Sequence, residues 1–162
     1  MKEVGELLDW IGIVFDALGR HEDALRMKEE TLAFRRRILP KDHPDIAASM
    51  NNLAITYGDL GRHKDALRMR EDTLALFRRI LPKDHPDIGD SMNNLANTYG
   101  DLGRHEDALR MREDALAFRR RILPEDHPDI GDSMSNLAIT YSDLGRQYSD
   151  CLLYTSPSPR DS

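Results

Sequence analysis

The feature of this sequence that most constrains its fold is a repeat with a period of 42 residues. The tripeptide Leu-Gly-Arg begins at residues 18, 60, 102 and 144, and His-Pro-Asp-Ile begins at residues 43, 85 and 127. Between segments 60–101 and 102–143, 34 of the 42 positions are identical. A unit of this length forms one supersecondary element that cannot bury its apolar face alone, so successive units must stack. The repeat therefore predicts a solenoid rather than a domain with one central core.

Each unit is predicted to contain two helices, because no segment alternates apolar and polar residues with a period of two. In the first helix, apolar residues follow at steps of four and three from Ile46 to Leu60, as on one side of an α-helix. Pro44 suits the first turn of this helix, and Gly61 suits a left-handed residue that ends it. The second helix is expected to end at Pro82. The pattern predicts an all-α array with helix pairs at about 3–38, 45–80 and 87–122, then a lone first helix at about 129–143.

The composition predicts a soluble, cytoplasmic protein. Lysine and arginine total 23 against 29 aspartate and glutamate residues, and the net charge of −6 disfavours a nucleic-acid-binding surface. No run approaches the ~18 consecutive apolar residues of a membrane span, so no membrane contact is expected. A secretory leader is not expected at the amino end either. Cys151 is the single cysteine, which excludes a disulfide framework.

A short signature recurs in the helix pairs. Leu53-Ala54-x-x-Tyr57 in the first helix is followed by Ala66 in the second, where small alanines let the two helices approach closely. This signature resembles the tetratricopeptide repeat, and the 42-residue unit is similar to the kinesin-light-chain type of that repeat. The resemblance covers about 1–146 and implies a right-handed superhelical solenoid of antiparallel helix pairs, about three and a half repeats long. Its units are about 1–42, 43–84, 85–126 and a partial 127–146.

One position in the second helix departs from that family. Lys28, Arg70 and Arg112 stand where the family often has an aromatic residue, and a methionine precedes each of them. Either the methionines pack into the core at this point, or the helix is slightly rotated.

The repeat stops after Arg146. Instead of a second helix the sequence continues with Gln147-Tyr148-Ser149-Asp150, and Cys151–Asp161 resembles the conceptual translation of a transposon-based sequencing adapter. We therefore expect 147–162 to be a disordered and artefactual tail. A natural Ser/Pro-rich tail is the alternative.

No residue pattern predicts catalysis, a cofactor or a metal site. The six histidines recur one repeat apart without the spacing of a zinc site, so they are expected to be turn and cap residues. Asp84-His85 and its copies are likewise expected to cap helices rather than to form an acid–base pair. The sequence has no nucleotide-binding glycine motif and no nucleophile elbow. A non-enzymatic chain is expected.

Arginines gather near the end of each second helix, at 35–37, 78–79 and 119–121. Such clusters could bind phosphate groups or acidic partner segments. Because the net charge is negative and acids such as Glu71 and Asp72 lie one or two turns earlier, a solvated face is the favoured interpretation.

In the tetratricopeptide family the first helices line a concave groove, and the resemblance implies that residues beside the apolar stripe contact a ligand. A side-chain amide offers two donors and an acceptor, so stacked asparagines can bond the backbone of an extended peptide whatever its sequence. The alternative, in which amides only tie neighbouring helices together, stays open for Asn52, Asn94 and Asn136. The candidate peptide-binding residues are Asn51, Asn52, Ile55, Asn93, Asn94, Asn97, Ser135, Asn136 and Ile139. Asp9 and Ile13 hold matching places in the opening helix, and Asp59, Asp90, Asp101, Asp132 and Asp143 predict an acidic groove.

These observations favour a protein-interaction scaffold or adaptor whose groove holds a peptide segment that carries lysine or arginine. Two alternatives remain open: a regulatory or sensor segment of a larger signalling ATPase or enzyme, and a kinesin-light-chain cargo adaptor. The last helix lacks a partner for its apolar stripe. We therefore expect fraying beyond about 128 and self-association through that end.

Overall fold

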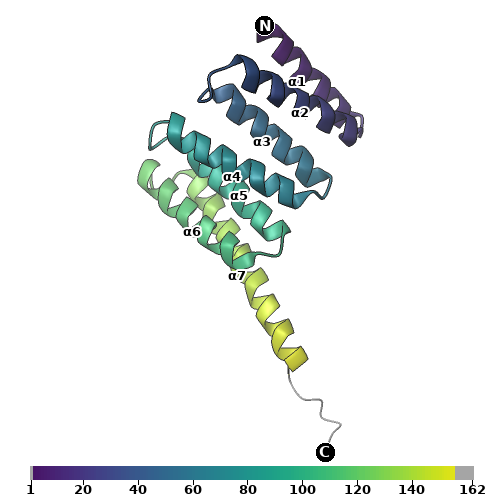
Figure 1. Ribbon diagram of the computed structural model, residues 1–162. Helices are drawn as coiled ribbons and strands as arrows, with labels where there is room; N and C mark the ends of the chain where they lie inside the picture. Colours follow the sequence, from purple (N-terminus) through teal and green to yellow (C-terminus); the bar gives the residue numbers. More distant parts are fainter. Residues whose placement is uncertain (1, 156–162) are drawn as a thin grey trace, which may run out of the picture.

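The computed structural model describes the backbone of residues 2–155 and the side chains of residues 4–148. Within that range the chain forms helices and no strand, and neighbouring helices pack as antiparallel pairs in chain order (Figure 1). The all-α array of about three and a half repeats is therefore confirmed. The helices are α1 (Lys2–Ala17), α2 (His21–Ile38), α3 (Pro44–Asp59), α4 (His63–Ile80), α5 (Pro86–Asp101), α6 (His105–Ile122) and α7 (Pro128–Thr155).

The odd-numbered helices α3, α5 and α7 are capped at their starts by histidine. The Nδ1 atom of His43 accepts a hydrogen bond from the backbone N–H of Asp45 at 3.1 Å, and Pro44 fills the first turn, where a missing donor costs nothing. His85 and His127 accept the equivalent bond at 3.2 Å each. The predicted cap role of these three histidines is confirmed, with the imidazole ring as the acceptor.

The Leu-Gly-Arg tripeptide ends each of the first three odd-numbered helices. Gly61 has a φ of +70°, a conformation open mainly to glycine, and the N–H of Arg62 bonds back to the carbonyl of Tyr57 at 2.8 Å. The Arg62 guanidinium then lies over the Tyr57 ring, 4.6 Å from its centre, and its Nε donates to Asp65 at 2.8 Å. The predicted stop at Gly61 is confirmed, and the arginine fixes the next helix against it. The same arrangement recurs at Gly19 and Gly103.

The core fills the space within each helix pair and between successive pairs. Leu53, Ala54 and Ala66 are buried, and Ala54 has no exposed surface, so α3 and α4 approach closely as the signature predicts. Tyr57 is also buried, and its hydroxyl donates to Glu29 of the preceding unit at 2.7 Å. Tyr99 and Tyr141 make the equivalent bonds to Glu71 and Glu113, at 3.1 and 2.8 Å. These bonds fix the register of each unit on the one before it.

Tyr57 gives the array a defined weakness at high pH. Burial, together with the hydrogen bond to Glu29, raises the pKa of Tyr57 from 10.0 to about 12. Because the folded state favours the neutral phenol, this stabilisation is complete below pH ~10 and is lost as the pH rises through ~12. We expect the wild-type chain to lose more stability than a Tyr57→Phe variant between pH ~9 and ~11.5. Urea unfolding at both pH values measures this, and equal losses in the two proteins would contradict the assignment.

The last helix is longer than the sequence predicts. It runs to Thr155 instead of ending near residue 143, and Gly145 does not adopt the left-handed conformation of Gly19, Gly61 and Gly103. Each complete unit buries an alanine early in its second helix, at positions 24, 66 and 108, whereas position 150 is aspartate. A second helix without that small apolar residue could not pack closely on α7, so the chain continues straight (Figure 1). Residues 147–155, expected to be disordered, are thus helical, and residues 156–162 lie outside the described part.

Amide hydrogen exchange is expected to be at least ~10-fold faster in residues 130–143 than in residues 88–101. Met134 and Tyr141 are 49% and 51% exposed, whereas Met92 is 4% exposed and Tyr99 is half-buried at the same repeat positions. Exchange measured by mass spectrometry tests this difference, and equal protection would show that α7 is held as firmly as α5. Self-association through this exposed side of α7 stays a prediction.

Candidate functional site

Each odd-numbered helix presents one solvent-facing strip whose residues are spaced four, three and four apart. This spacing places them on one side of a helix. We call these strips together the odd-helix face. It consists of Glu6, Trp10, Ile13 and Ala17 in α1, Ala48, Asn52, Ile55 and Asp59 in α3, Asp90, Asn94, Asn97 and Asp101 in α5, and Asp132, Asn136, Ile139 and Asp143 in α7. All are exposed except Asn94, Asn136 and Asp143, which are half-buried.

A row of isoleucines runs across this face. Ile13, Ile55 and Ile139 occupy the same repeat position and are 57%, 44% and 56% exposed, and Asn97 interrupts the row. Trp10 lies beside the row and is 70% exposed. Large apolar side chains aligned in this way on a solvent-facing surface mark a place where a partner can bury them.

The asparagines that were predicted to bind a peptide divide into those whose side-chain amides bond to arginines and those, such as Asn52, whose side chains bond to no described residue. Asn51 accepts a hydrogen bond from Arg70 Nη1 at 3.4 Å, and Asn97 accepts one from Arg112 Nη2 at 2.9 Å. These amides link helices within the array. No hydrogen bond between described residues involves the side chain of Asn52. Ser135 is exposed, but its hydroxyl donates to the backbone carbonyl of Gly131 at 3.0 Å, within its own helix.

Arg119 of α6 is buried, although the sequence suggests a solvated face for the arginine run that contains it. Its Nη1 donates to Ser133 of α7 at 2.8 Å, and its Nη2 pairs with Asp90 of α5 at 2.5 Å. The Asn93 carbonyl oxygen, when turned toward the guanidinium, accepts from both nitrogens at 3.0 and 3.2 Å. Arg119 therefore joins the first helix of its own unit to the first helix of the next unit.

Arg35 makes the same link near the amino end. It is 9% exposed, donates to Ser49 of α3 at 2.6 Å and pairs with Asp9 of α1 at 2.5 Å. The solvated-face interpretation is thus wrong for Arg35 and Arg119, because acceptors on two helices satisfy the buried guanidinium. The other members of the runs, Arg36, Arg37, Arg78, Arg79, Arg120 and Arg121, are exposed, which agrees both with a solvated face and with a surface that binds an acidic partner.

The basic residues at the position of the family aromatic also point inward. Lys28 is buried, and its Nζ donates to Thr56 of α3 at 2.6 Å and pairs with Asp16 of α1. Burial lowers the pKa of Arg70 and of Arg112 from their ordinary values. Long stems pack in the interior while the charged ends reach acceptors between odd-numbered helices. The preceding methionine contributes most to the core at Met69, which is buried.

A cleft of about 660 Å³ opens beside the odd-helix face between α1, α2 and α3. Glu6, Ala48 and Asn52 of that face line the cleft together with Asp9. The cleft is large enough for a side chain, and Glu6 and Asp9 of α1 place carboxylates in its lining, whereas no isoleucine of the row lines it.

Carboxylates make the odd-helix face acidic. Asp59, Asp101 and Asp132 are exposed, and the Asp90 side chain is 56% exposed despite its contact with Arg119. Asp143 is paired with Arg146 at 3.1 Å. The acidic character therefore rests mainly on carboxylates of α3, α5 and the first turns of α7.

Neither a metal centre nor a membrane span is found in the described part of the chain. Its His, Cys, Asp and Glu side chains form no group of three that could hold a metal ion. None of its helices is long and apolar enough to cross a lipid bilayer.

Known proteins of similar structure carry the same kind of repeat. A protein of Podosopora anserina, described as a kinesin light chain with nearly identical TPR-like repeats, aligns with a TM-score of 0.76 at 25% identity over 86% of this chain and 66% of its own. BtubC of P. vanneervenii aligns at 0.78 and 22% identity over 98% of this chain and 68% of its own. The TPR2AB domain of yeast Sti1, in complex with pHSP90, aligns at 0.69 and 15% identity over 97% of this chain and 53% of its own. No curated protein matches by sequence.

Tetratricopeptide repeats generally form protein–protein interaction domains and are typically non-catalytic. The sequence patterns of this repeat match residues 3–79 and 89–129. Together with the stacked helix pairs, the close approach at Ala54 and the glycine-ended first helices, these matches settle the classification: the chain belongs to the tetratricopeptide repeat family.

Proposed function

We propose that this array is a non-catalytic interaction module that holds an extended peptide along the odd-helix face. The observation that supports this most is the row of Ile13, Ile55 and Ile139, exposed at one repeat position in three of the four odd-numbered helices. Because the row crosses successive helices, a segment lying across the stack can bury all three side chains. Asn52, Asn94 and Asn136 lie beside the row, where their amides can bond the peptide backbone.

The charge of the face defines the partner further. Asp59, Asp101 and Asp132 flank the row and are exposed, so a partner segment with lysine or arginine is favoured. The amides of Asn51, Asn93 and Asn97 face arginines of the even-numbered helices. They link neighbouring helices, and the Asn97 side chain is also exposed on the odd-helix face.

A selected peptide tests this proposal. Peptides are taken from a random displayed library by binding to the chain, and their affinities are measured by calorimetry at low and high salt. We expect enrichment of lysine or arginine beside apolar residues, and a Kd that rises at least ~10-fold between ~50 and ~500 mM NaCl, because these exposed charges are screened. Selection of acidic peptides at this face, or binding that does not respond to salt, contradicts the proposal.

Position 55 offers a matched substitution. Ile55→Asn copies the residue that the next unit carries at Asn97, and we expect it to weaken the selected peptide ~5- to 30-fold through the loss of a buried apolar side chain. Ala33→Asn, on the exposed side of α2, serves as the control and is expected to leave the Kd unchanged. Equal effects of the two substitutions would place the peptide elsewhere.

A second candidate is the cargo adaptor of a kinesin light chain. The likeness to the Podosopora anserina repeats favours it. Heptad repeats encoded upstream of the array, which would pair it with a motor chain, are expected on this hypothesis. A nucleotide-binding motif encoded there instead would support the regulatory segment of a signalling ATPase.

A further inference from the structure

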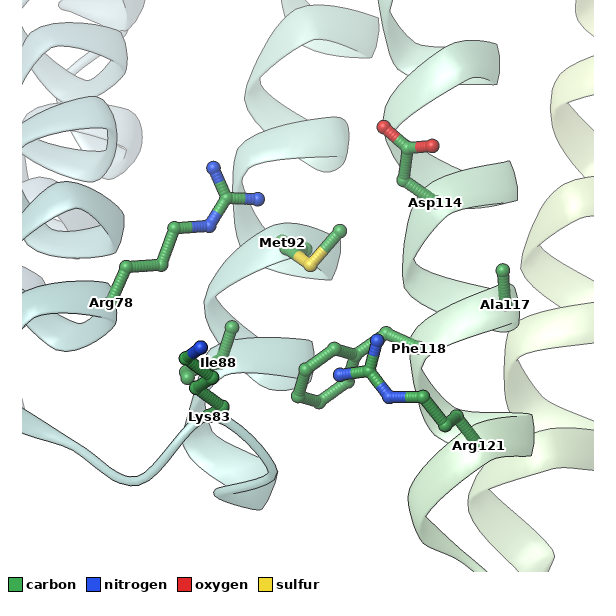
Figure 2. A pocket seen from close by; sticks show the side chains of 8 residues that line it. All are labelled: Arg78, Lys83, Ile88, Met92, Asp114, Ala117, Phe118 and Arg121. Atoms are coloured by element: carbon green, nitrogen blue, oxygen red, sulfur yellow. The ribbon is translucent and has the colours of Figure 1, made fainter.

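Two equivalent pockets lie on the other side of the stack, between the even-numbered helices. The pocket between α4 and α6, with a volume of about 400 Å³, has Ile88 and Met92 of α5 and Phe118 of α6 in its apolar lining (Figure 2). One unit earlier, a pocket of about 410 Å³ between α2 and α4 is lined by Ile46, Met50 and Leu76 at the same repeat positions. No residue of the odd-helix face lines either pocket.

Three basic side chains surround each of these twin pockets. In Figure 2, Arg78, Lys83 and Arg121 stand around the apolar lining, with Asp114 as the single carboxylate. Arg36, Lys41, Arg79 and Asp72 hold the same places in the earlier pocket.

Most of this positive charge is not paired with a carboxylate. Arg121 pairs with Asp84 at 3.1 Å, and Arg79 pairs with Asp42 at 2.5 Å. In the described part of the chain, no ion pair involves Arg36, Lys41, Arg78 or Lys83. Free cations beside an apolar pocket are unexpected in a chain with a net charge of −6, and they provide the charge complementarity for an acidic ligand.

We propose that the twin pockets bind one acidic peptide segment that inserts two large apolar side chains, each flanked by aspartate or glutamate. A volume of ~400 Å³ lies at the small end of ligand pockets and suits one side chain, and the cations at the rim suit its acidic neighbours. The repetition of the pocket makes the second insertion intramolecular once the first has occurred, which strengthens binding without new contacts.

Other polyanions fit this surface less well. Four carboxylates, those of Asp42, Asp72, Asp84 and Asp114, lie beside or within the two sets of cations. These carboxylates repel a nucleic-acid backbone or an anionic bilayer more than they repel a segment that places two apolar residues in the pockets. The array would then carry a basic partner on the odd-helix face and an acidic partner on the opposite side, and the two proposals stand independently.

The third complete unit supplies the substitution that tests this inference. Glu125 stands where Lys41 and Lys83 stand in the preceding units, so Lys41→Glu with Lys83→Glu copies a residue that the repeat already tolerates. The matched control is Lys64→Glu with Arg68→Glu, which makes the same change of charge at exposed sites outside both pockets. Position 64 is also glutamate in the neighbouring units, at Glu22 and Glu106. Circular dichroism checks that both double variants fold.

The probe is a fluorescein-labelled peptide with two Glu-Leu-Glu segments joined by a Gly-Ser linker. Its binding to the full chain is measured by fluorescence anisotropy. A series of linker lengths is used, and the tightest member is compared with peptides in which Ser replaces Leu or one segment is removed. We expect the pocket variant, the Ser peptide and the one-segment peptide each to weaken binding at least ~10-fold, and the control variant to change it less than ~3-fold.

Several outcomes would overturn the inference. These are no binding of any linker length up to ~1 mM, equal losses in the pocket and control variants, or full affinity of the Ser peptide. Phosphatidylserine vesicles or single-stranded RNA that bind with the same Lys41 and Lys83 dependence, while the peptides do not, would assign the pockets to those ligands instead.

Discussion

Replacing Leu95 with alanine is expected to lower the free energy of unfolding by about 2–5 kcal/mol. Leu95 is 3% exposed and packs in the cluster formed by Leu74, Ile88, Met92 and Ala115, between two helix pairs. Removal of its side chain leaves a cavity at an interface between units. Each unit of a repeat array is held only by its neighbours. The lost free energy therefore weakens the contact between the α3–α4 pair and the α5–α6 pair. Urea unfolding followed by circular dichroism measures it.

Leu137 provides the control at the same repeat position. It is only half-buried in α7, so Leu137→Ala is expected to cost less than half as much as Leu95→Ala. The Leu95 variant is further expected to broaden the unfolding transition, because the units on either side of this interface then unfold less cooperatively. Equal costs at the two positions would contradict the contrast between a packed middle unit and a one-sided last helix.

Replacing Arg119 with alanine is expected to destabilise the array by about 2–3 kcal/mol. The change removes the donors that bind Ser133 and Asp90, and it leaves acceptors on α5 and α7 without their partner. Because the Asp90 side chain is 56% exposed, water compensates part of the loss, and the expected cost lies below the ~3–5 kcal/mol for a fully buried ion pair.

The neighbouring arginine of the same run is the control for this experiment. Arg120 is exposed, and Arg120→Ala is expected to change the free energy of unfolding by less than ~0.5 kcal/mol. Thermal or urea unfolding of the two variants decides between the buried and the solvated interpretation of the run. A tolerated Arg119→Ala substitution would show that the guanidinium is solvated after all.

The helix boundaries could be predicted because they depend on local chemistry that the repeat displays several times. Gly61 ends α3 because it adopts a left-handed conformation, and Pro44 starts α3 because proline fits the first helical turn. Neither effect depends on distant residues. The end of α7 was mispredicted because Gly145 stands in the same tripeptide as Gly61. Whether that glycine turns depends on the packing of the next segment, and here that segment lacks the alanine that a second helix needs.

The buried arginines were missed because exposed and buried arginines share one run. A signal existed in the sequence: Phe77 stands in the middle unit where Arg35 and Arg119 stand in its neighbours. A position that accepts phenylalanine faces the interior, and an arginine there must have found acceptors. The aromatic that the family often has at the position of Lys28 carries the same information.

The exposure of the candidate residues was predicted more successfully than their hydrogen bonds. Period and family resemblance place Asn52, Ile55 and Ile139 on the outward side of first helices, and the structure exposes them there. The partners of Asn51 and Asn97 depend on long arginines that reach in from another helix, which spacing within one helix does not reveal.

Site-specific photo-crosslinking tests directly whether a peptide binds along the odd-helix face. A benzophenone side chain is placed at Ile55 on the odd-helix face or at Ala33 on α2, and each protein is illuminated with the selected basic peptide. We expect a crosslink from position 55 that excess unlabelled peptide abolishes, and none from position 33. Crosslinking from position 33 alone would show that the peptide binds outside the odd-helix face.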